Sequence, residues 1–316
     1  MDEQIAGGLR AVLVDTRPDP STTQQLDSLG SLPLVVVGVA HETGAGLAVA
    51  DVVVGPDDPA LAAIITTIET NPIAATSLAV LLRMTTALDT SSGDAVDVAL
   101  AAESATYSTL QAGAEFATWR AGRSGSAPAP DPADAVVIER SSADDRQLTI
   151  WLNRPHRHNA FSRSMRDALC DALALAVVDD QITSIELRGN GPSFCSGGDL
   201  GEFGGFDDPA SAHHTRLTRS PARLMHRIGD RCTAYLHGFC IGAGIELPAF
   251  CHRIVATPDA RIGLPEVSLG LVPGAGGTVS LPRRIGRQRT AYLALSGVQL
   301  TAPEALAWGL VDAIAD

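Results

Sequence analysis

The second half of the chain alternates between short apolar runs and longer stretches with helical spacing. Four runs rich in β-branched and aliphatic residues predict strands, at 147–153, 182–188, 233–237 and 253–257. Helices are predicted after them, at about 162–178, from 243 onward, within 276–295 and at 302–308. Strands separated by helices indicate mostly parallel pairing with helices packed outside, so the predicted fold class is α/β.

The first half has two apolar runs, at 10–15 and 33–40, that predict buried strands. Apolar residues at helical spacing then predict three helices, at 59–68, 71–88 and 94–121. We find no cluster of acids, histidines or nucleophiles in this half that predicts a site.

The clearest break in composition is 123–134, RSGSAPAPDPAD, where Pro, Ala, Ser and Gly replace every apolar period. We interpret it as a linker between a region at 1–122 and a core at 135–316. A chain of 316 residues is long enough for two such units.

Composition narrows the class of protein. Hydrophobic residues make up 45% of the chain, but no apolar run approaches the roughly 18–20 residues of a membrane span. The first ten residues open acidic and lack the basic-then-apolar order of a secretory signal. A cytoplasmic protein that does not bind a membrane is therefore expected.

The net charge of −13 argues against nucleic acid as a partner, because phosphates require a basic face. Anionic ligands must then be held locally. The five cysteines form no CxxC pair and predict reduced structural residues. The histidines have no third ligand at a metal-binding spacing, so we expect neither a metal nor a separate cofactor.

Three glycine-bearing turns occur in order, at 194–200 (FCSGGDL), 237–247 (HGFCIGAGIEL) and 271–278 (LVPGAGGT). Small residues let backbone N–H groups approach a ligand oxygen, and a helix N-terminus adds partial positive charge there. Two such turns that face each other would form an oxyanion hole. One turn alone would be weak evidence, because any tight strand-to-helix connection can require glycine.

Two acids follow these turns. Glu246 and Glu266 each stand between apolar neighbours, in IGAGIELPAF and IGLPEVSLG. Burying a carboxylate is costly unless it is paired or used, and desolvation raises its pKa toward the range of a general acid. The two residues are a candidate acid/base pair. The alternative is that each carboxylate caps a helix or meets a buried arginine.

Four segments resemble, in order and approximate spacing, signature segments of the enoyl-CoA hydratase/isomerase (crotonase) superfamily. They are SFCSGGDL, HGFCIGAGIEL, LPEVSLGLVPGAGGT and ALAWGLVD, and the resemblance covers 146–316. It implies a crotonase-like ββα superhelix core with an additional helical region. It also implies that the thioester oxygen accepts hydrogen bonds from the backbone N–H groups of Gly198 and Ala243. Members more often have Gly at the second position, but a backbone donor survives the change to Ala.

The resemblance gives the two acids roles. Glu246 would activate water for attack at C3 of a 2-enoyl-CoA, and Glu266 would deliver the proton at C2. Because both acids are retained, hydration or the reverse dehydration is favoured. A double-bond isomerase, a thioester hydrolase and a catalytically silent acyl-CoA-binding subunit stay open as alternatives.

The segment 153–161 resembles the family segment that lies near the CoA nucleotide. Arg157, His158 and Ala160 are therefore expected at the substrate, although the two basic residues are equally compatible with solvated loop charges. Asp199, also expected there, is predicted to order its turn. Gly201 stands where many members carry a Lys. The family forms trimers and paired trimers, so a homotrimer or hexamer that binds acyl-CoA is expected.

Members of the family continue beyond a GLVD-type segment into a helical tail, whereas this sequence ends a few residues after it. Segments at 50–58, 71–83 and 98–120 resemble that tail. We therefore hypothesise a circular permutation, in which residues from about 50 to 122 supply the helices that ordinarily follow the core. Permutation is physically reasonable because the termini of a domain often lie close together.

Overall fold

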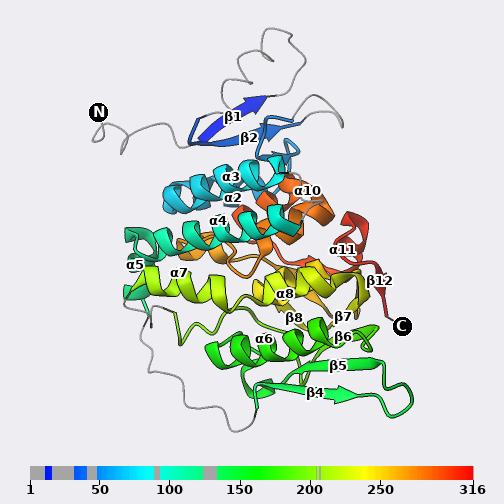
Figure 1. Ribbon diagram of the computed structural model, residues 1–316. Coiled ribbons are helices and arrows are strands. Elements are labelled where there is room, and N and C mark those ends of the chain that lie inside the picture. Colours follow the sequence, from blue (N-terminus) through cyan, green and yellow to red (C-terminus); the bar gives the residue numbers. More distant parts are fainter. Residues whose placement is uncertain are drawn as a thin grey trace.

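A computed structural model describes most of the chain (Figure 1). The described residues are 11–15, 32–40, 48–88, 93–123, 134–203, 205 and 208–315, with the backbone alone for 11–15 and 93. Most of the predicted linker, residues 124–133, lies outside them. The predicted boundaries at 122 and 134 therefore stay predictions.

The largest sheet has six strands in the order β12-β9-β7-β6-β5-β4. All neighbouring pairs are parallel except β4 and β5, which are antiparallel. Burial alternates along β5, which places Leu148, Ile150 and Leu152 on the core face. The strands are β4 (Val136–Arg140), β5 (Gln147–Leu152), β6 (Ser184–Gly189), β7 (Cys232–Leu236), β9 (Arg253–Ala256) and β12 (Ala313–Ile314).

A second, three-stranded sheet lies beside the glycine-bearing turns, with β10 parallel to β8 and antiparallel to β11. Its strands are β8 (Phe239–Ile241), β10 (Arg261–Gly263) and β11 (Leu300–Thr301). Helices and single 3-10 turns connect the strands of the two sheets. They are η2 (Pro155–Arg157), α6 (Arg163–Val178), α7 (Pro209–Thr218), α8 (Pro221–Ile228), η3 (Gly229–Arg231), α9 (Ala243–Glu246), η4 (Pro248–Phe250), η5 (Glu266–Leu269), α10 (Gly277–Ser296) and α11 (Ala302–Trp308).

Helices α7 and α8 were not among the predicted elements. The apolar positions of α7 are few, so its periodicity is weak, and its start is fixed by a cap instead. The Asp208 carboxylate accepts from the amides of Ala210 and Ser211, and Ser220 caps α8 by accepting from Arg223 N. In both helices a proline follows the cap, a position that it tolerates well.

The first half forms a parallel three-stranded sheet followed by four helices. The elements are β1 (Ala11–Asp15), β2 (Val35–Val39), β3 (Val52–Val54), α2 (Ala60–Thr70), α3 (Pro72–Ala87), α4 (Gly93–Gln111) and α5 (Ala114–Ala121). The prediction of one helix over 94–121 is wrong, because the segment is divided into α4 and α5. Gly113 adopts an extended conformation (φ −83°, ψ 161°) between them, and glycine is a poor helix former.

The two halves share one hydrophobic core. Helix α10 packs against α2, α3, α4 and β3, while α4 also packs against α7 and α8 (Figure 1). Buried Val37 and Leu78 belong to the same apolar cluster as Leu236 and Leu293. Residues 71–120 therefore pack on the core, as the permutation hypothesis requires, and the hypothesis itself stays a prediction.

Within the described ranges, no single helix combines the length and apolar composition of a membrane span. Only α2 and α3 taken together pass that test, as a pair bent by 108°, which is weak evidence by itself.

Candidate active site

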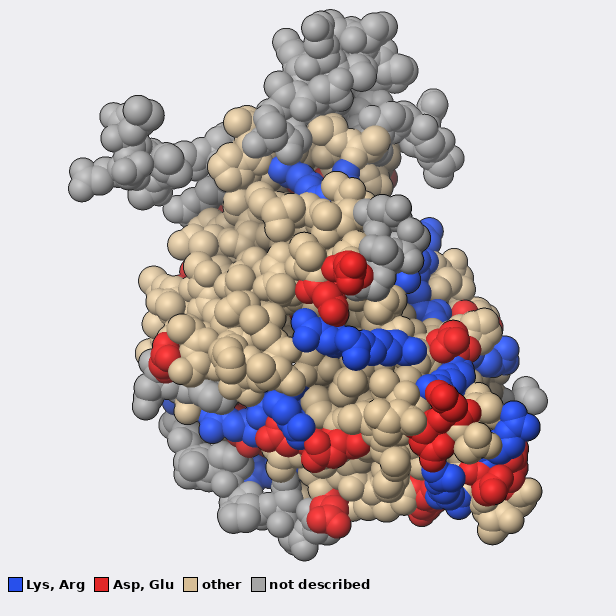
Figure 2. All heavy atoms as spheres, viewed as in Figure 1, with Lys and Arg blue, Asp and Glu red and all other residues tan. Residues whose placement is uncertain are grey.

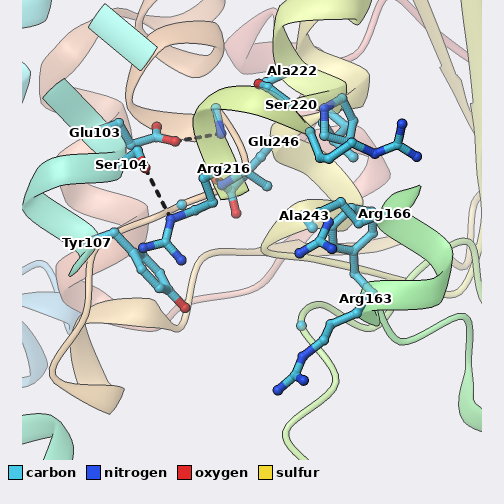
Figure 3. A pocket seen from close by; sticks show the side chains of 18 of the residues that line it. Glu103, Ser104, Tyr107, Arg163, Arg166, Arg216, Ser220, Ala222, Ala243 and Glu246 are labelled. Carbon is cyan, nitrogen blue, oxygen red and sulfur yellow. Dashed lines mark hydrogen bonds between the residues drawn. The ribbon is translucent and has the colours of Figure 1, made fainter. Parts of the chain in front are cut away.

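A hollow opens between α4, α6, α7 and α8, above the glycine-bearing turns (Figure 3). Its volume, with the open mouth included, is about 1140 Å³. Five residues predicted from sequence line it: Gly198, Asp199, Ala243, Glu246 and Glu266. The fold therefore gathers the predicted amides and acids in a single space.

The first two turns lie against each other. Cys195 and Cys240 form a parallel bridge, and the Ile241 amide donates to the Cys195 carbonyl at 3.0 Å. In the described part of the chain, neither the Gly198 nor the Ala243 amide donates to a protein acceptor. Because Ala243 is the first residue of α9, its N–H lies at a helix N-terminus, where no intrahelical acceptor exists. Both amides are thus available to a ligand oxygen.

Gly242 brings the two acids together. It has a positive φ of 52°, and a Cβ atom at this position would collide with Glu266 Oε1 and stand 3.7 Å from Glu246 Oε1. The absence of a side chain leaves both carboxyl groups room beside the second turn. The two acids consequently face the same small volume next to the Ala243 amide.

The Glu246 carboxyl group is 2% exposed and is held at the N-terminus of α10. Its Oε2 accepts from the Ala275 amide at 2.7 Å and from the Gly277 amide at 2.9 Å. Burial raises the pKa of Glu246 well above its usual range, and the nearby carboxyl groups of Glu266 and Glu103 raise it further. The two amides oppose this shift, because they stabilise the charged form.

Glu266 is the first residue of η5, and the environment of its carboxyl group differs from that of Glu246. Its Oε2 is buried and finds no hydrogen-bond partner, so nothing on that side stabilises a negative charge. Burial raises the pKa of Glu266 to about 8, so the group holds a proton at neutral pH. A buried, protonated carboxyl group beside a second acid is a suitable proton donor.

A third buried acid, Glu103, enters from α4 in the first half of the chain (Figure 3). It accepts from the Gly276 amide at 2.7 Å, from the Thr278 amide at 2.9 Å and from the Thr278 hydroxyl at 2.7 Å. Burial raises its pKa to about 7 despite these bonds. Glu103 and Glu246 therefore bind alternate amides of one segment, 275–278.

The sequence of the first half showed no cluster that predicts a site, yet one of its helices contributes to the wall of the hollow. Glu103, Ser104, Tyr107 and Gln111 all lie on the wall of the hollow, on one face of α4. A signal was present, because Glu103 stands in the apolar helical stretch VALAAES, the same kind of context that identified Glu246. Without the fold, however, nothing placed this helix beside α10.

The residues expected near the CoA nucleotide are not on the wall of the hollow. Arg157 and Ala160 are half-buried, whereas His158 is exposed and its Nδ1 lies 2.9 Å from Ser193 Oγ. Asp199 does line the hollow. Its carboxylate pairs with the buried Arg154 at 2.9 Å and accepts from the Gly201 amide at 3.0 Å.

No three His, Cys, Asp or Glu side chains of the described residues come together as a metal site. All 23 basic residues of the chain are arginine, so every cation that faces the hollow is a guanidinium. On the face in Figure 2 these cations lie next to acidic side chains and do not form a broad basic patch.

Comparisons with known proteins show which proteins this chain is similar to. Residues 146–316 match the family model described as enoyl-CoA hydratase/isomerase. The chain is 37% identical over 171 residues to the 2,3-dehydroadipyl-CoA hydratase of Escherichia coli (strain K12), covering 54% of this chain and 66% of that protein. It is 36% identical over 175 residues to an enoyl-CoA isomerase/hydratase of Mycosarcoma maydis, covering 52% and 64%. The chain thus spans about two thirds of the length of these relatives.

Solved structures give the same picture. An enoyl-CoA hydratase from Thermoplasma volcanium is similar with a TM-score of 0.53 and 38% identity, over 58% of this chain and 73% of that one. A structure described as an enoyl-CoA hydratase/isomerase from Mycobacterium abscessus gives a TM-score of 0.54 and 31% identity, over 58% and 71%. These likenesses confirm the predicted α/β, crotonase-like fold.

Proposed function

Because the chain belongs to the enoyl-CoA hydratase/isomerase family, we propose that it adds water across the 2,3 double bond of an acyl-CoA thioester, or removes it. One observation carries the proposal. Two buried acids, Glu246 and Glu266, meet at Gly242 beside two amides that have no acceptor among the described residues. The E. coli relative is itself named as a hydratase.

The two amides supply electrostatic stabilisation. When the thioester oxygen lies between Gly198 N–H and Ala243 N–H, both donors meet the negative charge that develops as C3 is attacked. Preorganised donors of this kind are worth about 10²–10³ in rate. Neither depends on a side chain, so Ala243 serves as well as glycine.

The two acids divide the proton transfers. Glu246, which accepts from two amides, is the better holder of the negative charge in the pair. It takes a proton from water while the water oxygen bonds to C3, and the double-bond electrons move into the enolate. Glu266, which has no acceptor or donor at Oε2, holds the proton that goes to C2 as the enolate collapses. A proton then returns from Glu246 to Glu266 to restore the pair.

The test is hydration of a short 2-enoyl-CoA. The reaction is measured as the loss of ultraviolet absorbance of the conjugated thioester. Glu246→Gln and Glu266→Gln preserve size and remove the ionisable group. Each is expected to lower kcat by about 10²–10⁴, the usual contribution of a general acid or base. Glu139→Gln, at an exposed acid on β4, is the matched control and should retain the wild-type rate.

Three outcomes would contradict the proposal. Equal rates in the wild type and both site variants would favour the alternative of a catalytically silent acyl-CoA-binding subunit. Migration of the double bond of a 3-enoyl-CoA without any hydration would indicate an isomerase. Release of free CoA thiol, followed with a thiol reagent, would indicate a thioester hydrolase.

A further inference from the structure

Arg216 is the one arginine on the wall of the hollow for which the described residues supply no carboxylate partner. It lies on α7, and its guanidinium is held by α4 (Figure 3). Nε donates to Ser104 Oγ at 3.2 Å, while Nη2 donates to Gln111 Oε1 at 3.2 Å and also to Ser108 Oγ. The guanidinium carbon stands 4.7 Å from the centre of the Tyr107 ring. Every one of these partners is neutral.

The other arginines on the wall have acidic partners. Arg166 pairs with Asp167 at 2.9 Å, Arg219 pairs with Asp171 at 2.9 Å, and Arg163 lies 3.9 Å from Glu202. Burial lowers the pKa of Arg216, because removing a cation from water is unfavourable, and the charges of Tyr107 and Glu103 oppose this shift. Its neighbour Glu103 forms no ion pair with it, because that carboxylate is held by Gly276 and Thr278.

The hydrogen bonds leave one end of the guanidinium unused. An arginine side chain has five N–H donors, and Nε and Nη2 account for three of them. Within the described part of the chain, Nη1 donates to no protein acceptor, and it is not a buried unsatisfied atom. Ser104, Ser108, Gln111 and Tyr107 therefore hold the group in place while two N–H donors stay open to a ligand in the hollow.

We propose that Arg216 binds a carboxylate at the far end of the acyl chain, so that the preferred substrate is the CoA thioester of a dicarboxylic acid. The inference rests on the proposed function for the thioester end. Arg216 shares the hollow with Glu246, Glu266 and both free amides, so an acyl chain bound at those amides extends through the same space. The free Nη1 can donate a charge-assisted hydrogen bond to an oxygen of that carboxylate.

A CoA phosphate is the competing ligand for this cation. Phosphates of the nucleotide carry more charge and remain hydrated, so they belong at an exposed rim. Arg216 instead stands beside Tyr107, whose own pKa is raised by burial and by the carboxyl groups of Glu266 and Glu246. The proposal assigns this partly buried cation, which lies over the Tyr107 ring, to the acyl end of the hollow. The two ligands make different predictions.

The experiment compares two six-carbon 2-enoyl-CoA thioesters, one ending in a methyl group and one in a carboxylate. We expect the wild type to favour the carboxylate by at least tenfold in kcat/KM. Arg216→Gln should lower kcat/KM for the carboxylate substrate about a hundredfold, as truncation of a desolvated charge partner does, and that for the methyl substrate less than threefold. Arg216→Lys, which keeps the charge, should restore part of the preference.

Arg223→Gln is the matched control. Arg223 ties α8 to α4 through Asp97 at 2.8 Å and does not line the hollow, so its loss should leave the ratio of the two substrates unchanged. An equal fall for both substrates in Arg216→Gln would overturn the proposal and assign Arg216 to CoA phosphate or to helix packing. Equal use of both substrates by the wild type would overturn it as well.

Binding of saturated analogues to the wild type separates the inference from the proposed function. Calorimetry with hexanoyl-CoA and with its carboxyl-terminated counterpart requires no turnover and no variant that must fold. Tighter binding of the carboxylate by tenfold or more is expected. If neither enoyl thioester is hydrated, the proposed function fails, but tighter binding of the carboxylate still supports the role of Arg216. If both analogues bind equally, the role of Arg216 is overturned even when hydration is observed.

Discussion

Residues 146–316 and residues 48–121 both place a buried carboxylate at the N-terminus of α10. Glu246 comes from the first region and accepts from the amides of Ala275 and Gly277, whereas Glu103 comes from the second and accepts from those of Gly276 and Thr278. The two acids alternate along four consecutive residues. The helical region is therefore part of the wall of the site and is not merely attached to the core.

The two carboxylates at this helix end differ in how many of their oxygens accept hydrogen bonds from the segment 275–278. Glu246 has Oε1 beside Glu266, and this side of the group is open to chemistry. Both oxygens of Glu103 accept hydrogen bonds from the protein. Oε1 accepts from the Gly276 amide, and Oε2 accepts from the amide and the hydroxyl of Thr278. One region thus carries the acids that we propose react, and the other binds the segment 275–278 that also holds Glu246.

The largest expected effect comes from substitutions that create a cavity in the core of each region, because they test whether the two regions unfold together. Leu78 of α3 and Leu236 of β7 are both fully buried in the shared cluster. Leu78→Ala and Leu236→Ala should each lower the free energy of unfolding by about 2–5 kcal/mol. Because the core is continuous, urea unfolding followed by fluorescence and by circular dichroism should show one transition in each variant. Separate transitions for the two signals would mean that the regions fold independently.

The free energy of unfolding should depend on pH through Glu266, one of the two acids of residues 146–316. Folded Glu266 holds its proton up to about pH 8, whereas an unfolded glutamate releases it near 4.5. Between these values the folded state binds more protons, so stability falls as pH rises, by about 1.4 kcal/mol per pH unit for one proton. Urea unfolding at pH 6 and pH 8 should show this decrease, and Glu266→Gln should reduce it. The same slope in wild type and variant would place the Glu266 carboxyl group in water.

The smallest expected effect distinguishes Glu103 from Glu115, another glutamate of the helical region. Glu103→Gln should lower kcat about tenfold, because a buried hydrogen bond to a charged group is lost at the loop that holds Glu246. It should also move the acidic limb of the pH profile to lower pH, since the charge of Glu103 raises the pKa of both Glu246 and Glu266.

Glu115 is the control for that variant. Its carboxylate caps α3 by accepting from the amides of Ile73 and Ala74, at 2.7 and 2.9 Å, away from the hollow. Glu115→Gln should cost about 1 kcal/mol of stability, as the loss of a cap does, and leave the pH profile unchanged. Identical pH profiles in the Glu103 and Glu115 variants would reduce Glu103 to an ordinary cap.

Sequence reasoning succeeded where the signal was local. The strands at 147–153 and 253–257 and the helix at 162–178 were predicted nearly to their ends. Runs of β-branched residues and helical spacing are properties of neighbouring residues. The turns that carry Gly198 and Ala243 were predicted for the same reason. Helix α7 was missed because its polar composition hides the period. Helix α8 has buried residues at helical spacing but is only 8 residues long, so its signal is short.

By itself, then, the sequence determined the fold class, the glycine-bearing turns and the two acids Glu246 and Glu266. Only the tertiary structure decided that Glu103 meets α10 and that Arg216 faces the hollow without a carboxylate. The physical reason is the distance along the chain: Glu103 and Thr278 are 175 residues apart, and Ser104 and Arg216 are 112 apart. No local pattern encodes such a contact, because burial and hydrogen bonding at these positions exist only once α4 has packed on α7 and α10.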